Sequence, residues 1–464
     1  MKPKTKLRSK LLLLISLFVA ISFYSCSSDG EEDKEDDFIK IEQTGNLSLK
    51  HGENFELILE TNITLSHFDN QKYQLQWGNE TLKYNVVRTN DNKIKITSQA
   101  KYKDQSYPLT IVDKVSGQIV STGPKLLVER TYAAKYVDYL SDPLLSMCLD
   151  REGNIITISG YSFSEIRKRT IKYKGIRQEL GKPEFDITRT ELPLPLDFDG
   201  YTLGSITVIN SQYPELDRCG TLVNGGNIYF SQRYGNLQTK EIVHTIIKYD
   251  GVSSNRYADG NINAVFKHPV SNIIMNSKGV MFAVEYSVPV IYKLSKEDGS
   301  GVWAGSPYEK GNKDGNRIVA RFSDIIDMKI DKNDNIYIAE KTKVRKITPD
   351  GVVTTLVGTD DAHDIDGTLA ATRFSEIKAL ALDNSGKLYV AGIDREHAKS
   401  YIKVIDQTDN TIKSLSIDGS FIKLDYQADM LILNNGIIAI GTHGYNTFNR
   451  AYSLVSVTPL DMFD

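Results

Sequence analysis

Polar residues that could bind a ligand or a metal ion stand just before apolar runs at four places in the second half of the chain. They are His268 in FKHPV, Asp324 in RFSDII, Glu376 in RFSEIK and Gln427 in YQADML. Carboxylates together with a neutral imidazole can hold a divalent cation or form hydrogen bonds to a polar ligand. The alternative is that all four are solvated polar groups. Whether they meet depends on the elements that carry them.

A second set of residues combines aromatic rings with polar donors, and each group follows an apolar run. It comprises Tyr161 and Phe163 in GYSF, Arg233 and Tyr234 in SQRYGN, and His443, Tyr445 and Phe448 in GTHGYNTFNR. Exposed aromatic faces beside polar donors suit a sugar ring, because its C–H face stacks while its hydroxyls need partners. The alternative is that these side chains pack loops onto the neighbouring strands.

Motifs of known catalytic mechanics are missing from the sequence. It contains no H-E-x-x-H, no G-x-S-x-G, no G-x-G-x-x-G after a strand and no paired C-x-x-C. Asp331, Asn333 and Asn335 imitate the start of a calcium loop, but Ile336 replaces the required glycine and Thr342 replaces the bidentate glutamate. We therefore interpret this segment as a hairpin turn. No residue is predicted to be catalytic, and no cofactor is predicted.

The elements that would carry these residues form a repeat. Its unit is an apolar strand, a turn similar to D/N-x-x-G and a second apolar strand, and the copies start about 50 to 55 residues apart, with one longer gap. Six copies occur, at residues 144–160, 219–232, 270–285, 325–340, 377–392 and 428–441. Third and fourth strands follow, such as Val344–Pro349 and Val352–Gly358. Six units of four antiparallel strands predict a six-bladed β-propeller.

Ring closure places the candidate residues. The last copy ends after its third strand, so we expect the segment near 132–137 to supply the missing outer strand. The start of each innermost strand faces the mouth of the central channel, where His268, Asp324, Glu376 and Gln427 could converge. A divalent cation bound at the channel mouth is the one cofactor that the sequence leaves as an alternative. The aromatic set lies on blades six, one and two, which are neighbours in a closed ring.

The connectors between units also repeat and indicate a family. DGNINAVF, DGNRIVARF and DGTLAATRF precede three successive units, and RKITPDGVVTTLVG precedes the last of these. Over residues 250–406 this pattern resembles the NHL family of propeller repeats. That family includes enzymes with metal and catalytic groups in the channel, so the resemblance keeps a metal-dependent hydrolase or lyase as an alternative function.

Residues 38–130 contain alternating strand-like runs separated by Gly, Asn and Asp turns, which predict a β-sandwich. The run YPLTIVDKVSGQIVSTGPKLLVE resembles the end of an immunoglobulin-like domain of the IPT/TIG type. Trp77 shares a strand face with Tyr73 and Leu75 and is expected in the core. The fold class expected for the whole chain is therefore all-β, an Ig-like sandwich followed by a six-bladed NHL-type propeller over residues 131–464.

The N-terminus carries a targeting signal. Five basic residues precede the apolar run 11–22, which is too short to span a bilayer. Cys26 ends this region and resembles the lipidated cysteine of bacterial lipoproteins, with residues 1–25 as signal peptide. Residues 26–37 form an acidic tether that resembles the surface-export stretch of Bacteroidota lipoproteins. The resemblance implies a lipid anchor in the outer membrane that faces the cell exterior.

Composition and domain pairing together give the functional expectation. The chain has 464 residues, 40% hydrophobic and 25% charged, and a net charge of −3, so a nucleic-acid partner is not expected. Lipoproteins that pair an IPT/TIG-like domain with NHL repeats resemble the surface binding proteins of glycan-uptake systems. We therefore expect a non-catalytic binder of a polysaccharide or other nutrient that works with an outer-membrane transporter. A protein-interaction or adhesion platform is the third alternative.

Overall fold

A computed structural model gives the structure of the protein. It describes residues 38–69, 72–90, 92–103, 105–140, 144–150, 152–162, 165–177, 182–191, 197–198, 201–202, 221–224, 226–236, 238–239, 241–257, 265–295, 299–418, 424, 428–445 and 450–463. This part of the chain is almost entirely β-structure, with one short helix, α1 (Leu65–Asp69), and one 3-10 turn, η3 (Leu460–Phe463). None of its helices has the length and apolar character that crossing a membrane requires.

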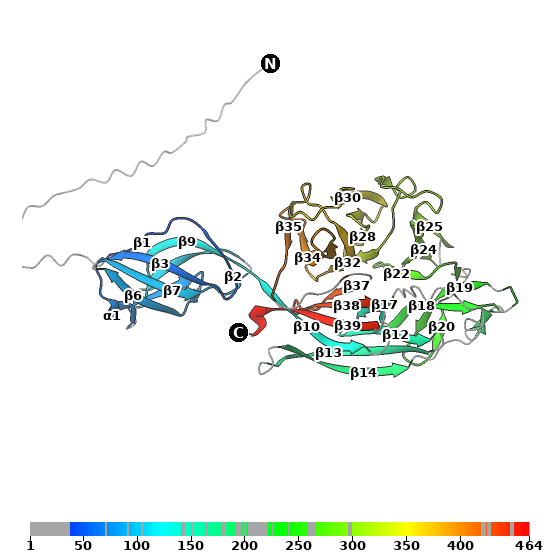
Figure 1. Cartoon of the computed structure of the whole chain (residues 1–464), viewed down its shortest axis with the longest axis horizontal. Coiled ribbons are helices and arrows are strands. Elements are labelled where there is room, and N and C mark those ends of the chain that lie inside the picture. The colour runs from blue at the N-terminus through cyan, green and yellow to red at the C-terminus, as the bar shows by residue number, and fades with distance from the viewer. Residues whose placement is uncertain are drawn as a thin grey trace, which may run out of the picture.

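Two antiparallel-rich sheets pack face to face at the N-terminal end of the described chain (Figure 1). One sheet has the order β1 (Ile39–Ile41), β3 (Asn54–Thr61), β7 (Lys93–Gln99) and β6 (Tyr84–Asn90). The other has the order β2 (Leu47–Lys50), β9 (Ile119–Glu129), β8 (Tyr107–Asp113), β4 (Tyr73–Trp77) and β5 (Glu80–Thr81). One apolar cluster fills the space between them, and Trp77 lies wholly buried in it, as expected.

Six further sheets occur among the described residues from Thr131 onward, and each is one propeller blade. Their strands, from the innermost outward, are as follows: blade 1, β11 (Leu144–Leu149), β12 (Ile155–Ser162), β13 (Glu165–Arg177), β14 (Lys182–Glu191); blade 2, β17 (Thr221–Asn224), β18 (Asn227–Gly235), β19 (Ile242–Tyr249), β20 (Ser254–Arg256); blade 3, β22 (Val270–Met275), β23 (Met281–Glu285), β24 (Val290–Ser295), β25 (Gly299–Gly305); blade 4, β27 (Asp327–Ile330), β28 (Ile336–Ala339), β29 (Lys343–Ile347), β30 (Val352–Gly358); blade 5, β32 (Glu376–Leu382), β33 (Leu388–Asp394), β34 (Lys399–Asp406), β35 (Thr411–Ser414); and blade 6, β37 (Ala428–Ile432), β38 (Ile438–Tyr445), β39 (Arg450–Pro459), β10 (Thr131–Leu140).

The inner strands close into a ring. β11 contacts β17, and contacts continue through β22, β27, β32 and β37 back to β11. Short additional strands extend four blades: β15 (Asp197–Phe198), β16 (Tyr201–Thr202) and β21 (Val265–Phe266) on blade 2, β26 (Gly315–Asn316) on blade 4, β31 (Gly367–Thr368) on blade 5 and β36 (Ser416–Asp418) on blade 6. The all-β, six-bladed prediction is confirmed. Apolar clusters lie between successive blades, because each sheet can bury its two apolar faces only against its neighbours.

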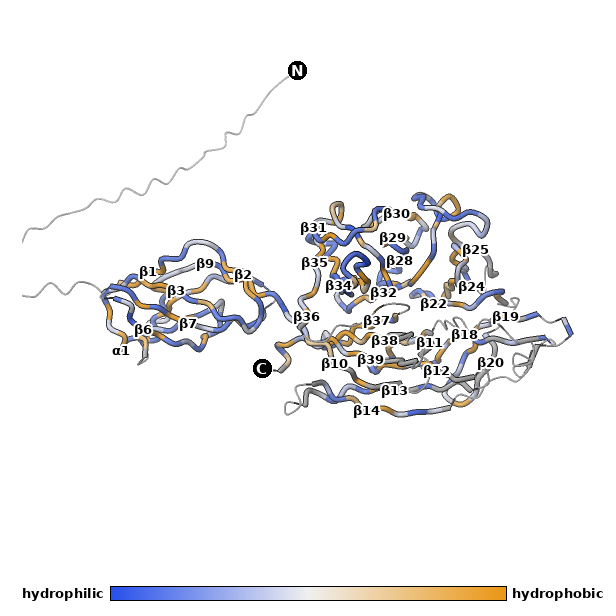
Figure 2. The backbone as a smooth tube through the Cα atoms, viewed as in Figure 1, coloured by the Kyte–Doolittle hydropathy of each residue, from blue (hydrophilic) through white to orange (hydrophobic). Residues whose placement is uncertain are grey.

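The turn between the first two strands explains the repeated sequence. In blade 4 the Asp331 carboxylate accepts the N–H of Asn335 at 2.9 Å, and Asp150, Asn276 and Asp383 accept the equivalent N–H in three other blades. The fourth turn position has a positive φ, which favours glycine, although Asp334 occupies it in blade 4. The Asp331 carboxylate thus caps its own hairpin, which confirms the interpretation as a turn. Figure 2 shows the alternation of hydrophobic and hydrophilic residues along the strands that these turns join.

The ring is closed by a strand from the N-terminal side, as predicted. β10 pairs with β39 in antiparallel register from Tyr132↔Pro459 to Leu140↔Tyr452. Only Arg130 separates β10 from β9 of the sandwich. Its guanidinium donates to both carboxylate oxygens of Asp461 at 2.8 Å and lies 4.8 Å from the centre of the Tyr102 ring. Arg130 therefore joins the sandwich to the C-terminal turn η3 of the propeller, where the two meet in Figure 1.

Candidate functional site

The inner strands of all six blades surround a central channel that contains a cavity of about 260 Å³. Polar and apolar surface contribute about equally to its wall, and the polar side chains that line it are few. These are Ser146, Ser271, Asn272, Lys329 and Asp429, with the thiol of Cys148 beside them. In this channel the Lys329 ammonium of blade 4 is close enough to the Asp429 carboxylate of blade 6 to interact with its charge. The channel is therefore the candidate functional site.

Asp327 on β27 organises this channel. Its Oδ1 accepts hydrogen bonds from Asn272 Nδ2 at 2.8 Å and from the N–H of the next residue, Met328, at 2.7 Å. Its Oδ2 accepts the N–H of Leu380 at 2.7 Å. These partners belong to blades 3, 4 and 5. The side chain is only 3% exposed. A carboxylate that is buried and fully hydrogen-bonded in this way is a fixed anion rather than a group that reaches a ligand.

Lys329 is the ionic partner of this carboxylate and the group that a ligand can reach. Its Nζ lies 2.7 Å from Asp327 Oδ1, and its side chain is 23% exposed, toward the cavity. Burial alone would lower the pKa of the Lys329 ammonium, but the charges of Asp327 and Asp429 outweigh burial and raise it. The amine therefore stays protonated at neutral pH, where it donates hydrogen bonds and cannot act as a nucleophile or base.

Asp429 on β37 repeats the arrangement of Asp327 in another blade. Its Oδ2 accepts the N–H of Met147 on the adjacent inner strand at 3.0 Å, just as Asp327 accepts that of Leu380. Both aspartates stand three residues before the end of their inner strands. Each carboxylate thus satisfies a backbone donor at the free edge of the next blade, which would otherwise face the channel without a partner.

The four residues predicted at the channel mouth do not bond to one another in the described structure. His268 is exposed, and its backbone N–H donates to Glu285 Oε1 at 2.6 Å. Asp324 pairs with Lys310 at 2.6 Å and is 61% exposed. Glu376 pairs with Lys378 at 2.5 Å and with Arg395 at 2.6 Å. Gln427 lies outside the described residues.

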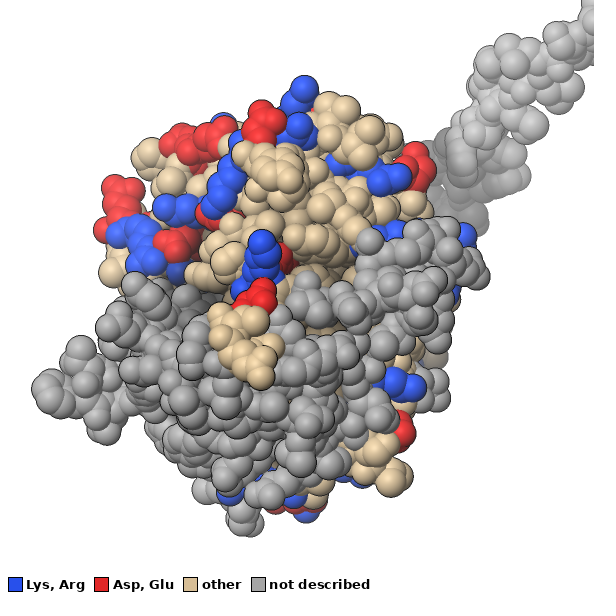
Figure 3. All heavy atoms as spheres, turned by 90° about the vertical axis from the view of Figure 1, so that its right-hand side faces the viewer, with Lys and Arg blue, Asp and Glu red and all other residues tan. Residues whose placement is uncertain are grey.

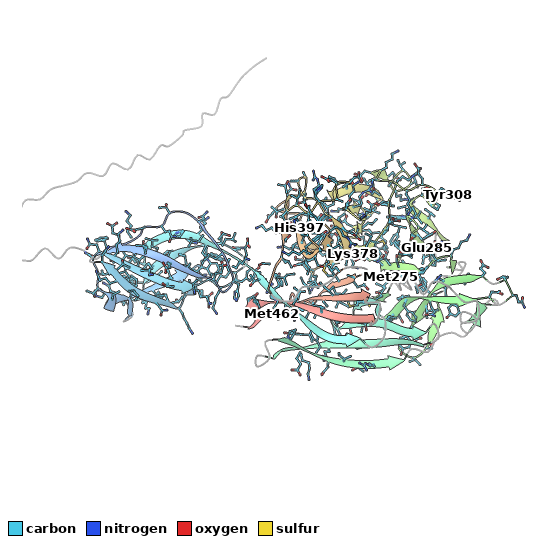
Figure 4. All side chains as sticks on the ribbon, viewed as in Figure 1. Met275, Glu285, Tyr308, Lys378, His397 and Met462 are labelled. Carbon is cyan, nitrogen blue, oxygen red and sulfur yellow. The ribbon has the colours of Figure 1, made fainter. Side chains whose placement is uncertain are left out.

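The Asp324 and Glu376 carboxylates form local ion pairs instead. Burial opposes ionisation of Glu376, but hydrogen bonds from Arg395 and Lys378 lower the pKa of its carboxyl group. Blade 5 carries this network as well as the exposed pair His397–Asp394, and Figure 4 labels Lys378 and His397. The described residues contain no group of three or more His, Cys, Asp or Glu side chains that could hold a metal ion. The cation site at the channel mouth has no support in this part of the structure.

The expected aromatic platform needs a correction at Tyr234. This residue lies in β18, and its side chain is wholly buried in the cluster between blades 1 and 2, against Ile158 and Phe230. Its ring therefore has no free face for a sugar, because it fills an interblade core position. Tyr161 lies in β12, Arg233 in β18, and His443 and Tyr445 in β38, but their side chains are outside the description, as are Phe163 and Phe448 entirely.

Three functional candidates were missed at the sequence level: Asp327, Lys329 and Asp429. A signal was present, because charges interrupt the apolar inner-strand segments IIDMKI and ADMLI. Alternation alone assigned these residues to strands, and did not indicate that they face a common channel. Of the cysteines, Cys148 has a partly exposed side chain in the channel wall, whereas Cys219 and Cys26 lie outside the described residues.

The outer surface shows no region of a single charge on the described part of the face in Figure 3, where basic and acidic side chains are interspersed. Exposed ion pairs such as Lys310–Asp324 bring opposite charges together on the molecular surface. Pairs of this kind contribute little to stability because water screens them. The charges of Asp327 and Lys329 inside the channel, in contrast, are largely shielded from bulk water and interact more strongly.

Comparison with known proteins finds distant structural similarities. No protein-family model matches it, and no curated protein matches its sequence. Similar solved structures include a protein of unknown function from Bacteroides thetaiotaomicron (12% identity, 92% of this chain and 99% of that chain, TM-score 0.43) and virginiamycin B lyase from Staphylococcus aureus (14%, 83% and 99%, 0.36). A gluconolactonase from Xanthomonas campestris has 9% identity, with 71% of this chain and 89% of that chain covered, and a TM-score of 0.36. Similarities of this size say nothing about what this chain binds.

Proposed function

We propose that this protein is a surface lipoprotein whose propeller binds a polysaccharide or another polar nutrient at its central channel, for delivery to an outer-membrane transporter. The observation that carries the proposal is the Lys329 ammonium, which Asp327 holds in place and which faces the cavity. A cation that cannot move away from its buried anion is a preorganised donor for the oxygen atoms of a ligand.

The size of the channel limits what enters it. At about 260 Å³ the cavity lies just below the range typical of pockets for drug-sized ligands, roughly 300 to 1,000 Å³. It can hold one small unit, such as a single sugar residue, while a longer chain would continue over the mouth. Hydroxyl and carbonyl oxygens of such a unit can accept from Lys329, and hydroxyl groups can donate to Asp429.

The membrane anchor is the second part of the proposal. It is supported by the basic and apolar N-terminal runs, by Cys26 and by the acidic residues after it. The resemblance to lipoproteins with IPT/TIG and NHL modules supports the same location. We expect cells grown with labelled palmitate to incorporate label into the protein, and Cys26→Ser to abolish incorporation and release the protein from the membrane. Retention of the label in the serine variant would contradict the anchor.

Binding can be tested directly with Lys329→Met. A glycan array identifies a ligand for the mature protein, and calorimetry then measures its affinity. Because a hydrogen bond to a charged group contributes about 1.5 to 3 kcal/mol, removal of the ammonium is expected to weaken binding about 10- to 100-fold. Lys332→Met, an exposed lysine in the adjacent turn, is the matched control and should bind as the parent does.

Loss of folding must be separated from loss of binding in this experiment. Lys329→Met leaves the Asp327 carboxylate buried without its cation, so the double variant Asp327→Asn, Lys329→Met is measured as well. We expect the double variant to regain stability while binding stays weak. Undiminished affinity in either variant would show that the ligand does not use Lys329, and the proposed channel site would have to be abandoned.

A further inference from the structure

The wall of the channel has two levels of different chemistry. Within each blade, the inner strand pairs with the second strand up to the turn that joins them. Residues at the same distance from this turn therefore lie at about the same height in the channel. In blades 1, 4, 5 and 6 the last residue of the inner strand before the turn is apolar and lines the cavity. We call these four residues the apolar collar: Leu149, Ile330, Leu382 and Ile432.

The polar groups lie deeper, three residues earlier in each strand. Ser146, Asn272, Asp327 and Asp429 occupy this level, and Lys329 folds back to it through its bond to Asp327. Three residues of extended strand separate the two levels by about 10 Å. The channel is therefore apolar next to the turns and polar further in.

The collar residues pack against the apolar clusters between the blades, but most of them keep exposed surface as well. Leu149, Ile330 and Leu382 remain partly exposed, and only Ile432 is buried, at 6% exposure. The apolar side chains two residues earlier in the same strands are more buried: Met328 is 1% exposed and Met430 is 0% exposed. The collar thus presents apolar surface to the cavity, where water is a poor partner for it.

We infer that the part of the ligand that enters the channel is amphiphilic, with a neutral oxygen-bearing group at Lys329 and a small apolar group in the collar. A unit with hydroxyl groups all around would leave the collar without a partner, and an anionic unit would be repelled because two carboxylates, Asp327 and Asp429, flank the single ammonium. This inference rests on the proposed function and narrows its ligand to sugars or similar nutrients that carry an alkyl or acyl substituent.

A series of methyl, propyl and hexyl β-D-glucopyranosides, below their micellar concentrations, tests the inference on the mature protein. Burial of a methylene group in the collar is expected to raise affinity about fourfold per added methylene until the chain fills the collar. Leu382→Ser should remove most of this dependence on chain length. Leu149→Ser should have the same effect and replaces Leu382→Ser if that variant folds poorly. Val352→Ser, on the outer surface, is the matched control.

A second readout uses the thiol in the channel wall. In protein with Cys26 removed and Cys219→Ser, the rate of Cys148 alkylation should fall when hexyl glucoside is bound, because Cys148 lines the same cavity. Equal affinity for all three glucosides would overturn the inference while leaving sugar binding intact. Absence of saturable hexyl glucoside binding would also overturn it, and the proposed function would then stand or fall on the glycan array alone.

Discussion

Asp327→Ala is expected to lower the free energy of unfolding by about 3 to 5 kcal/mol, the range typical for removal of one partner from a buried ion pair. The variant leaves the Lys329 ammonium in the channel without its anion. It also leaves Asn272 Nδ2 and the N–H of Leu380 without their acceptor. These groups belong to three different blades, so the loss acts on the ring rather than on one hairpin.

Urea unfolding of the mature protein, followed by circular dichroism, measures this effect. Asp327→Asn keeps the shape and the oxygen acceptor, and should lose less stability than the alanine variant. The control is Asp350→Ala, an exposed aspartate in the turn before β30, which should change the free energy of unfolding by about 0.5 kcal/mol or less. If Asp327→Ala unfolds at the same urea concentration as the control, the carboxylate does not hold the inner strands together.

Arg345→Ala is expected to have an effect of the same size, about 3 to 5 kcal/mol, because it breaks a second buried network. The Arg345 guanidinium is fully buried, bonds to Glu340 Oε2 at 3.0 Å and to Asp314 Oδ1 at 2.5 Å, and also donates to the backbone oxygen of Lys313. Glu340 is itself only 1% exposed. Without Arg345 this carboxylate would remain buried with only the Ser323 donors to satisfy it.

A double-mutant cycle separates the ion pair from the rest of the site. Arg345→Met with Glu340→Gln removes both charges and should recover part of the stability that Arg345→Met loses alone. Lys341→Ala, an exposed lysine in the adjacent turn, is the control. Additive effects of the two substitutions, with no coupling energy, would contradict a buried ion pair.

The same network explains why the connectors repeat. Asp314 of DGNRIVARF accepts hydrogen bonds from Arg345 and from the N–H of Thr355. Asp366 of DGTLAATRF forms an ion pair with Lys403 and accepts the N–H of Ser414. The connector phenylalanines, Phe322 and Phe374, lie beside the two buried cations. Burial would raise the pKa of Asp366, but Lys403 and the Ser414 N–H outweigh it and lower that pKa. In blades 4 and 5 the repeated aspartate therefore fastens the connector to its blade.

Much of the architecture followed from local patterns in the sequence. Alternation of apolar residues located the strands, the D-x-x-G-like turns located the hairpins, and the missing fourth strand of the last unit predicted the closing role of β10. These features depend on neighbours along the chain, so one sequence is enough to find them. The burial of Trp77 was predictable for the same reason, since it shares a strand face with Tyr73 and Leu75.

The site itself was decided by packing between blades. Alternation shows on which face of its sheet the side chain of a residue such as Tyr234 lies. Whether that face contacts solvent or another blade depends on how the ring closes, and in this ring the face is buried. Likewise, Asp327 finds its partners on β22 and β32, about fifty residues away in either direction. Hydrogen bonds and charges act over a few ångströms, so only the tertiary structure brings Lys329, Asp327 and Asp429 into one channel.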